Sequence, residues 1–394
     1  MSGYGILVEC FLTSAIMNNR RIKLGMIGGG HGAFIGIVHR IAAYMGEEYI
    51  LTGGVFDSDY DQSVDFAEQL ELDTSRVYED LDRLIERELQ LPEEERMQVL
   101  VIVTPNFLHY SMAKKLIEAN FHIICEKPVT TTLAEALELE TLVKKHGVVF
   151  SLTHTYTGYP MVRQMRVMIQ EGAIGAVQKV DAQYYQGWIN PVIHEKEKRA
   201  AVWRLDPARA GISCCMGDIG VHAFNLIEYT TGMEVQQLLS DINTLYDDNP
   251  LDVDGTVLLR LNNDIRGIVR ASQIATAEEN NIKIAVYGRK GGLKWEQENP
   301  NYLYYLREGE PVQVLKPGNP YNSDFAQQST KIAPGHPEGI FDAMGNIYKG
   351  TARAIRGESY TEGAFPTIRD GVRGMGFIEK VVESSREGNV WVDL

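Results

Sequence analysis

The sequence predicts an α/β fold in two parts: a doubly wound parallel sheet with helices on both faces, and then an α+β domain with an open, mostly antiparallel sheet. Strand-like and helix-like segments alternate up to residue 155, which is typical of a parallel sheet. Beyond residue 155 strand-like segments follow one another, which is typical of antiparallel pairing. A chain of 394 residues also exceeds the length that one hydrophobic core usually serves, so we expect two domains, at 21–155 and 156–394, after an N-terminal extension at 1–20.

Apolar runs and turn signals define the elements of the first domain. The segment 99–103 is apolar throughout, as expected of a strand buried on both faces of a parallel sheet. Thr132 and Glu135 form a capping-box pattern at the start of a helix that Gly147 ends. By the same reasoning we expect strands at 22–27, 49–56, 99–103, 122–125 and 148–152, and helices up to 45, at 60–70, through 113–119 and at 132–147.

The second domain is predicted from strand-like runs joined by short turns. Asn262-Asn263-Asp264 and Gly291-Gly292 are turn sequences that favour hairpins. Arg163 reads as a residue on the surface of a helix. We expect strands at 177–188, 235–246, 256–261, 266–274 and 282–287.

Composition and charge narrow the class of partner. The formal net charge of -15, without a cluster of Lys and Arg, disfavours nucleic acid, and a small molecule fits better. The apolar stretch 5–17 is too short to span a bilayer, so we expect no membrane partner. Cys10, Cys125, Cys214 and Cys215 form neither a disulfide framework nor a zinc pattern, so we expect reduced thiols, a cytoplasmic location and no metal.

A glycine motif at the first strand-to-helix junction predicts a dinucleotide site. Gly28-x-Gly30-x-x-Ala33 matches G-x-G-x-x-A directly after a strand and before a helix. The first glycine permits the sharp turn, the second lets the backbone approach a pyrophosphate, and Ala33 keeps helix and strand close, while the helix N-terminus offers free N–H groups. We expect the cofactor to contact this turn through Gly28, Gly30, His31, Gly32, Ala33 and Phe34.

Asp57 is the candidate that selects the cofactor. It follows the second predicted strand, where a carboxylate can accept hydrogen bonds from the adenine-ribose hydroxyls and repel a 2′-phosphate. We therefore expect NAD, with NADP less favoured. The alternative is that Asp57 or Asp59 caps the next helix.

Three further segments carry chemistry, and their order resembles a known family. They are Thr104-Pro105-Asn106-Phe107-Leu108-His109, Glu126-Lys127-Pro128 and Gly217-Asp218-Ile219-Gly220-Val221-His222. With the glycine motif, this order resembles the glucose-fructose oxidoreductase / inositol dehydrogenase / rhizopine catabolism (Gfo/Idh/MocA) family from residue 21 onward. The resemblance implies a Rossmann domain with an open sheet, NAD or NADP as cofactor, and oxidation or reduction of a ring hydroxyl or ketone.

The resemblance also implies that Lys127, Asp218 and His222 are the catalytic group. Taking hydride from an alcohol requires a base for the hydroxyl proton and a cation near the developing alkoxide. Asp218 and His222 are four residues apart, so on a helix the carboxylate can hold the imidazole or bind substrate. His222, with an imidazole near its usual pKa, is the preferred base. Lys127 could be the base instead if burial lowers its pKa.

Other site residues follow from position and from the resemblance. The loop after a parallel strand is where dinucleotides bind, although Asn106 could simply cap the next helix. We expect cofactor contacts from Thr104, Pro105, Asn106, His109, Glu126 and Lys127. Aromatic rings beside hydrogen-bonding groups suit a pyranose ring. We expect substrate contacts from Lys127, His154, Tyr156, Trp188, Arg204, Asp218 and His222.

The sequence thus favours an NAD-dependent dehydrogenase or reductase of a sugar, glycoside or cyclitol. One alternative holds NAD tightly and hydrolyses a glycoside without net redox change, and another is a non-catalytic NAD-binding regulator. The presence of Lys127, Asp218 and His222 together argues against the regulator. The open sheet would expose a face and edges in a monomer, so we expect a homodimer or a homotetramer. The stretch 211–216 departs from the glycine-rich sequence of many family members, which puts the substrate's identity in doubt.

Overall fold

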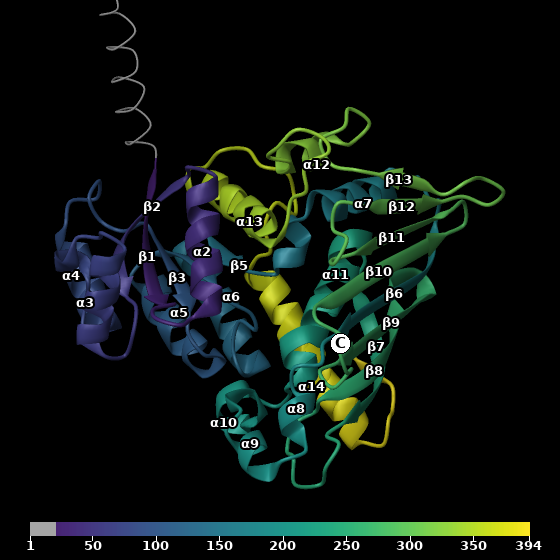
Figure 1. Cartoon of the computed structure of the whole chain (residues 1–394), viewed down its shortest axis with the longest axis horizontal. Helices are drawn as coiled ribbons and strands as arrows, with labels where there is room; N and C mark the ends of the chain where they lie inside the picture. The colour runs from purple at the N-terminus through teal and green to yellow at the C-terminus, as the bar shows by residue number, and fades with distance from the viewer. Residues whose placement is uncertain (1–20) are drawn as a thin grey trace, which may run out of the picture.

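The computed structural model describes residues 21–394, so the extension expected at 1–20 lies outside the described residues. Two sheets stand side by side with helices around and between them (Figure 1). The first sheet has five parallel strands in the order β2-β1-β3-β4-β5. Its strands are β1 (Ile22–Gly28), β2 (Tyr49–Val55), β3 (Val99–Val103), β4 (His122–Cys125) and β5 (Phe150–Leu152).

The strand order reverses between β1 and β3. On the free edge of β2, Gly54 forms a parallel bridge with Val77. Val77 thus takes the place of the third strand of the 3-2-1-4-5-6 dinucleotide-binding sheet. Ligands of such sheets bind beyond the carboxyl ends of the strands at the point of reversal. The fold therefore directs a ligand to the ends of β1 and β3, as the sequence predicts.

Helices cover both faces of the first sheet, which confirms the doubly wound prediction. One face packs on α2 and α3, and the other on α4, α5 and α6. The Thr132/Glu135 capping box and the left-handed Gly147 at the ends of α6 are both as predicted. The helices are α2 (Phe34–Met45), α3 (Tyr60–Gln69), α4 (Leu81–Gln90), α5 (His109–Glu118) and α6 (Leu133–His146).

A helix from the far end of the chain completes the first face. Met344, Tyr348 and Ala352 of α13 (Ile340–Ile355) belong to the same apolar cluster as Val38 and Ala42 of α2. Figure 1 shows α13 beside α2. The sequence did not predict that residues beyond 156 would share the core of the first domain.

The second sheet is open and mostly antiparallel, as predicted. Its order is β13-β12-β11-β10-β6-β9-β8-β7-β14, and among the pairs that the structure describes β6 and β9 alone run parallel. The turns at 262–264 and 291 both join hairpins. The strands are β6 (Val177–Tyr185), β7 (Val235–Asn243), β8 (Asp254–Leu261), β9 (Ile265–Ser272), β10 (Asn281–Gly288), β11 (Gly292–Glu296), β12 (Leu303–Leu306), β13 (Gln313–Leu315) and β14 (Val392–Asp393).

Helices pack on the inner face of this sheet and connect it to the first domain. Residues of α11 (Val221–Thr231) and α14 (Ile368–Arg386) share one apolar cluster with strands of both sheets. The remaining elements are α7 (Pro160–Gln170), α12 (Asp324–Ser329), the single turns η1 (Thr74–Arg76), η2 (Asn106–Leu108), η3 (Thr155–Gly158), η4 (Trp203–Leu205), η5 (Met216–Gly220) and η6 (Asn262–Asp264), and the short helices α8 (Asn190–Ile193), α9 (Lys196–Ala200) and α10 (Pro207–Ala210).

Arg163 was expected on a helix surface, and this expectation is wrong. Arg163 is 4% exposed because α7 is buried on nearly all sides. Its guanidinium donates to the carbonyls of Thr157 and Ala364 and to Ser329 Oγ, at 3.1, 2.7 and 2.8 Å. These acceptors satisfy the cation that the apolar surroundings would otherwise disfavour.

Residues 21–394 have two further properties, which concern membranes and metal ions. Over this part of the chain, no helix combines the length and the apolar character that a membrane crossing requires. The same residues contain no group of three His, Cys, Asp or Glu side chains arranged to hold a metal ion.

Candidate active site

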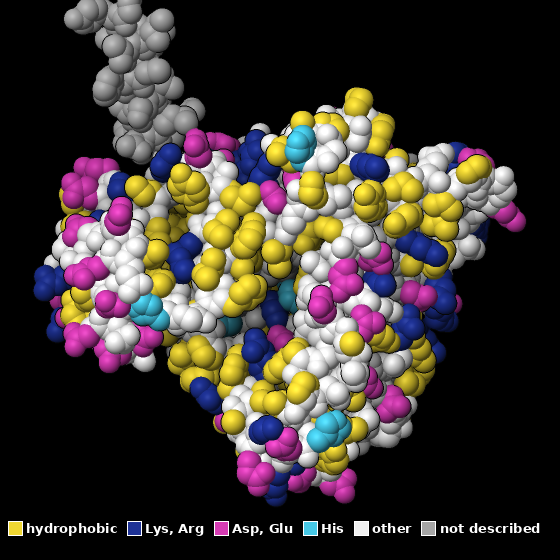
Figure 2. Space-filling view, in the orientation of Figure 1, with side chains coloured by type: hydrophobic (Ala, Val, Ile, Leu, Met, Phe, Trp, Pro, Cys, Tyr) yellow, Lys and Arg dark blue, Asp and Glu magenta, His cyan; other side chains and the backbone are white. Residues whose placement is uncertain are grey.

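A cavity of about 890 Å³ lies between the two sheets, beyond the carboxyl ends of β1, β3 and β4. Figure 2 shows a hollow at the centre of the face, with basic and histidine side chains inside it. The first domain lines it with Gly32, Ala33, Phe34, Ile35, Val103, Thr104, Pro105, Asn106, His109, Glu126, Lys127, Thr153 and Thr155. The rest of the chain adds Tyr156, Tyr184, Gln186, Trp188, Trp203, Arg204, Asp218, Ile219, His222, Asn280 and Ile340.

The glycine turn at the end of β1 is shaped for close backbone approach. Gly28 has a φ of 79°, which disfavours any side chain, and a Cβ on Gly30 would lie 2.7 Å from the Phe56 carbonyl oxygen. The turn leads into α2, whose N-cap Ala33 supplies no side-chain hydrogen bond. The first amides of α2 are thus left to an anion at the cavity, as the motif predicts.

Gly36, which the sequence did not single out, brings α2 into close contact with the glycine turn after β1. A Cβ on Gly36 would lie 2.4 Å from the carbonyl oxygen of Gly29, whereas Ala33 lines the cavity. The reason is that α2 begins at Phe34, so that its first turn presents Gly36 to the strand.

Of the two acidic residues after β2 that the sequence offered as helix caps, Asp59 is the one that caps α3. Asp59 caps α3 by accepting from the amides of Asp61 and Gln62, at 2.9 and 3.2 Å. Asp57 Oδ1 accepts from the Asp59 amide at 3.0 Å, and Asp57 Oδ2 has no hydrogen-bond partner within residues 21–394. The Phe56 carbonyl accepts from the Gly30 amide, which places the neighbouring Asp57 beside the glycine turn. Asp57 Oδ2 is therefore available there for a ligand.

His31 of the glycine turn faces α3 instead of the cavity. Its Nε2 lies 3.0 Å from Asp65 Oδ2, and the ring meets the Phe66 ring edge-on at 4.9 Å between centroids. His31 is absent from the cavity lining, so its side chain supports the turn from outside.

The loop after β3 reaches the cavity at Thr104, Pro105 and Asn106. The alternative that Asn106 caps the next helix is wrong, because Leu108 is the N-cap of α5 and Pro105 that of η2. His109 is buried beneath the loop, with its two ring nitrogens each 2.8 Å from a carbonyl, those of Pro128 and Thr104. His109 thus ties the loop after β3 to the loop after β4.

The side chain of Glu126, which follows β4, is fixed by contacts with neighbouring residues. Its carboxylate accepts from Thr153 Oγ1 at 2.6 Å and from the Lys127 amide at 3.2 Å, and it lies 2.9 Å from His39 Nε2. Burial raises the pKa of Glu126, but these neighbours outweigh burial and the pKa is lowered. His39 Nδ1 in turn lies 2.6 Å from Tyr348 Oη. Through this series of hydrogen bonds, which the sequence did not predict, α13 supports the site.

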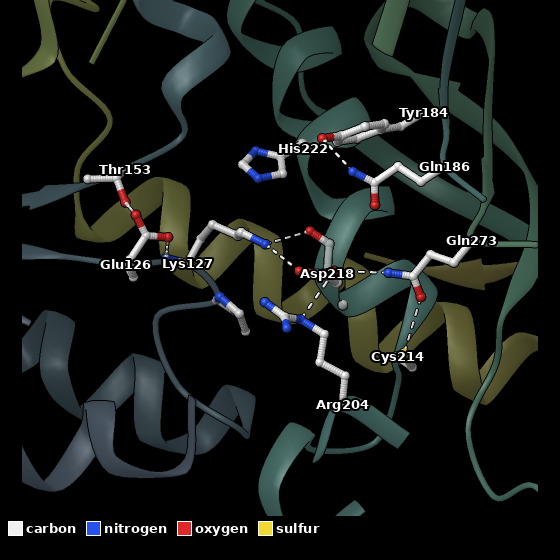
Figure 3. Close-up of polar contacts among 12 residues, drawn as sticks. Glu126, Lys127, Thr153, Tyr184, Gln186, Arg204, Cys214, Asp218, His222 and Gln273 are labelled. Atoms are coloured by element: carbon white, nitrogen blue, oxygen red, sulfur yellow. Dashed lines mark hydrogen bonds and ion pairs between the residues drawn. The ribbon is translucent and has the colours of Figure 1, made fainter. Parts of the chain in front are cut away.

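Lys127 and Asp218 form the centre of the site (Figure 3). Lys127 Nζ donates to both the carbonyl and Oδ1 of Asp218 at 2.7 Å. Asp218 Oδ2 accepts from Gln273 Nε2 at 2.9 Å and lies 3.4 Å from Arg204 Nε. Burial disfavours the carboxylate, but Lys127 and Arg204 outweigh it and lower the pKa of Asp218 to about 2. Since an ammonium has three donors, Lys127 keeps one for a ligand in the cavity.

Of the two roles considered for the Asp218 carboxylate, contact with the His222 imidazole is not formed. Asp218 lies in η5, a turn of π-helix that precedes α11, and its carboxylate faces Lys127, Arg204 and Gln273. The buried Asp252 fixes this turn by accepting from the amides at 214 and 216, at 2.9 and 2.8 Å. The wider turn and the two cations on its far side direct the carboxylate away from the imidazole.

His222 pairs instead with a second histidine. Its Nδ1 lies 3.2 Å from Nδ1 of His154, and the rings meet at 85° with centroids 5.2 Å apart. The rings of Tyr156 and Tyr184 lie 5.0 and 6.1 Å from the His222 ring. The pKa of His222, expected near its usual value, is lowered well below it by burial and by Lys127 and His154. A neutral imidazole able to accept a proton is the result.

His154 was expected to contact substrate, but its side chain lies behind His222. It is 1% exposed and does not line the cavity. Burial, with a smaller contribution from Lys127, lowers the pKa of His154 to about 3. His154 can therefore act on the site through His222.

Polar and aromatic groups line the wall beyond His222. Tyr156 and Tyr184 share a hydroxyl contact of 2.5 Å, and Tyr184 donates to Asn280 Oδ1 at 2.6 Å. Gln186 Nε2 donates to the same oxygen at 3.0 Å. Sequence reasoning missed Tyr184, Gln186 and Asn280. The inward alternation of β6 was the available signal for Tyr184, which shares a face with buried Ala182.

Trp188 and Arg204 reach the cavity from the segment of short helices. Trp188 is 39% exposed, and the Arg204 guanidinium lies 4.5 Å from the Trp203 ring and 5.8 Å from the Trp188 ring. Strand β6 ends at Tyr185, so Trp188 lies in the connection that follows and not in the strand as predicted.

The fold and the cavity define an oxidoreductase that uses a nicotinamide dinucleotide. The chain belongs to the Gfo/Idh/MocA oxidoreductase family. A model described as "Oxidoreductase family, NAD-binding Rossmann fold" matches residues 22–154, and "GFO/IDH/MocA C-terminal domain" matches residues 162–294. These matches confirm the resemblance and the NAD-binding first domain.

Similar proteins agree with this assignment. The uncharacterized oxidoreductase YfiI of Bacillus subtilis is 33% identical over 95% of this chain and 98% of its own. An inositol dehydrogenase homologue from Azotobacter vinelandii, complexed with NAD+, has a TM-score of 0.88 at 33% identity over 95% of this chain and 98% of that chain. That homologue is also known complexed with NADH and myo-inositol. Levoglucosan dehydrogenase of Pseudarthrobacter phenanthrenivorans is 27% identical over 76% of this chain and 80% of its own.

Proposed function

We propose that the protein transfers hydride between NAD and a ring hydroxyl of a sugar, glycoside or cyclitol. The observation that carries this proposal is one cavity in which Lys127, Asp218 and His222 meet beside the glycine turn of a dinucleotide-binding sheet. The names of two relatives, one an inositol dehydrogenase homologue and one a levoglucosan dehydrogenase, support a polyol or sugar as substrate.

The residues of the first domain fit the dinucleotide. Gly30 lets the glycine turn lie against the backbone of Phe56, where a Cβ would not fit, and the uncapped start of α2 suits a pyrophosphate. Asp57 would hold the adenine-ribose hydroxyls through its available oxygen, and Thr104, Pro105 and Asn106 would border the nicotinamide end. When bound, the nicotinamide ring supplies the acceptor for hydride.

The residues beside the cavity divide the remaining work. The third donor of the Lys127 ammonium binds the substrate oxygen and stabilises negative charge on it during reaction. Asp218, held ionised by Lys127 and Arg204, keeps that ammonium in place. His222 takes the hydroxyl proton, because its ring lines the cavity and a neutral imidazole has one nitrogen with a free lone pair. The geometry favours His222 over Lys127 as the base, since Lys127 already donates twice to Asp218.

The deciding experiment offers inositols, free hexoses and glucosides to the purified protein and follows NADH absorbance with NAD or NADP. We expect a substrate-dependent rise with NAD that Lys127→Ala and His222→Ala abolish. Release of an aglycone without accumulation of NADH would favour the redox-neutral glycosidase. Bound NAD without any turnover would favour the regulator.

We also propose that a second copy of the chain covers the outer face of the second sheet. Asp181 Oδ1 and Arg270 Nε on this face are buried without a hydrogen-bond partner within residues 21–394, and Leu258 is 42% exposed. The exposed Leu258 gives this open sheet an apolar surface, which favours cover by a second copy of the chain. Light scattering should give twice or four times the monomer mass, and Leu258→Asp together with Arg270→Glu should lower it. A monomeric wild type would contradict the proposal.

A cytoplasmic location is proposed from the thiols. Cys125, Cys214 and Cys215 are free and buried, and burial raises the pKa of each. Unreactive thiols without disulfides suit a reducing compartment. Fractionation of cells of the source organism should recover the protein with the cytoplasmic markers, and recovery outside the cell would contradict this.

A further inference from the structure

We propose that His154 sets the tautomer of His222: it accepts the Nδ1 proton of His222, so that Nε2 of His222 faces the cavity without a proton. This inference rests on the proposed function and adds to it a positioning residue that never touches substrate. The contact that carries it joins the two Nδ1 atoms at 3.2 Å.

A contact between two Nδ1 atoms admits one proton. A neutral imidazole has one protonated and one bare nitrogen, so the ring that donates through Nδ1 has a bare Nε2 and the other ring has a protonated Nε2. The contact therefore couples the tautomers of His154 and His222. Both rings are neutral, since burial lowers both pKa values and neither ring pairs with a carboxylate among residues 21–394.

Burial distinguishes the two rings. His222 lines the cavity while His154 does not, so Nε2 of His222, on the ring edge opposite the contact, is the nitrogen left for the substrate. The positive charge of Lys127 acts on His222 and favours a lone pair over an N–H at the cavity. The groups that face or influence the His222 ring are Lys127, His154, Tyr156 and Tyr184. Asp218 acts on the two tyrosines, and Glu126 acts on His154.

The arrangement gives His154 a role during reaction. The hydroxyl proton of the substrate moves to Nε2 of His222, the C–H bond gives its electron pair as hydride to NAD, and the oxygen becomes that of a ketone. His222 is then an imidazolium whose Nδ1 proton still bonds to the lone pair of His154. Without His154, the ring can rotate or take the other tautomer, whose protonated Nε2 is unable to act as a base.

The direct test is NMR of the full-length wild-type protein labelled with ¹⁵N-histidine, with His222 assigned by its loss in His222→Gln. The expected result at neutral pH is a bare Nε2 and a protonated Nδ1 on His222. A protonated Nε2 on His222 would overturn the proposal. The measurement requires no substrate, so it decides this point even where the dehydrogenase assay fails.

Kinetics of three variants give a second, independent test. His154→Ala should lower kcat by about 10-fold or more, as expected when a general base loses its orientation, with little change in the KM for NAD. His154→Asn, whose amide oxygen can accept near the position of Nδ1, should recover most of that loss. His154→Asp adds a negative charge beside His222 and should move the acidic limb of the pH profile to higher pH.

The matched control is Thr157→Val, which disturbs the same turn without touching either imidazole ring. Thr157 is buried and donates to the His154 carbonyl at 2.9 Å. If Thr157→Val shifts the pH profile as His154→Asp does, or if His154→Asn is no better than His154→Ala, a purely structural role for His154 is the correct one.

Discussion

Gly36 gives the sharpest test of how the cofactor half is built. Replacing it with alanine places a Cβ 2.4 Å from the Gly29 carbonyl oxygen. The oxygen belongs to the backbone and the Cβ is bonded to it, so neither atom can move away by a side-chain rotation. An ordinary contact is about 3.4 Å or more, so the start of α2 must move away from β1 by about 1 Å. Overpacking of this kind costs about 1–3 kcal/mol of folding free energy.

The displacement also acts on the cofactor, since the first amides of α2 move with the helix. We expect Gly36→Ala to lower the unfolding midpoint in urea and to weaken NAD binding measured by calorimetry. Gly345→Ala is the matched control, because it adds a methyl group on α13, which packs against α2, where the nearest atom is 3.5 Å away. Gly345→Ala should leave the free energy of unfolding unchanged or raise it by about 0.5–1 kcal/mol, because alanine favours a helix more than glycine does. If Gly36→Ala unfolds and binds NAD as the wild type does, the close approach that we describe is wrong.

Four further outcomes follow from the site and the core. Asp218→Asn removes the charge that holds the Lys127 ammonium and should lower kcat/KM by about 10²-fold or more in steady-state assays, with secondary structure unchanged by circular dichroism; near-normal turnover would contradict the role given to Asp218. Asp57→Ala should raise the use of NADP relative to NAD, measured as the ratio of the two kcat/KM values, and an unaltered ratio would remove Asp57 from cofactor selection. Arg163→Met leaves the carbonyls that Arg163 serves unpaired and should cost about 1–3 kcal/mol for each in urea titrations; an unchanged midpoint would show that solvent satisfies them. Stability should fall as the pH drops below 6.5, because the unfolded chain takes up a proton that His154, with a folded pKa of about 3, does not; this loss reaches about 2 kcal/mol by about pH 5 and should be smaller in His154→Asn.

The strands, hairpins and caps could be predicted from the sequence because they depend on neighbours in the chain. The run at 99–103, the turn at 262–264 and the capping box of Thr132 and Glu135 all formed as predicted. The glycine motif and the family order also predicted Lys127, Asp218 and His222, which line the cavity.

The errors concern partners that only the folded chain selects. Asp218 and His222 are close in sequence, yet Asp218 pairs with Lys127 and His222 with His154. Two of the three acceptors of Arg163, Ser329 and Ala364, come from segments more than one hundred residues away, which no local pattern shows. The same holds for Gln273, whose amide reaches Asp218 from the far end of β9.

The position of α13 has a consequence for the order in which the chain folds during synthesis. Residues 344, 348 and 352 cover part of one face of the first sheet. Tyr348 is also the last member of the hydrogen-bond series that runs from Glu126 through His39. When the ribosome has released residues 21–155, it has not yet released α13, which packs on them. Until nearly the whole polypeptide has emerged, the part of this face that α2 and α3 leave to α13 stays exposed, and a fragment ending at residue 155 should be less soluble and bind NAD more weakly than the full chain.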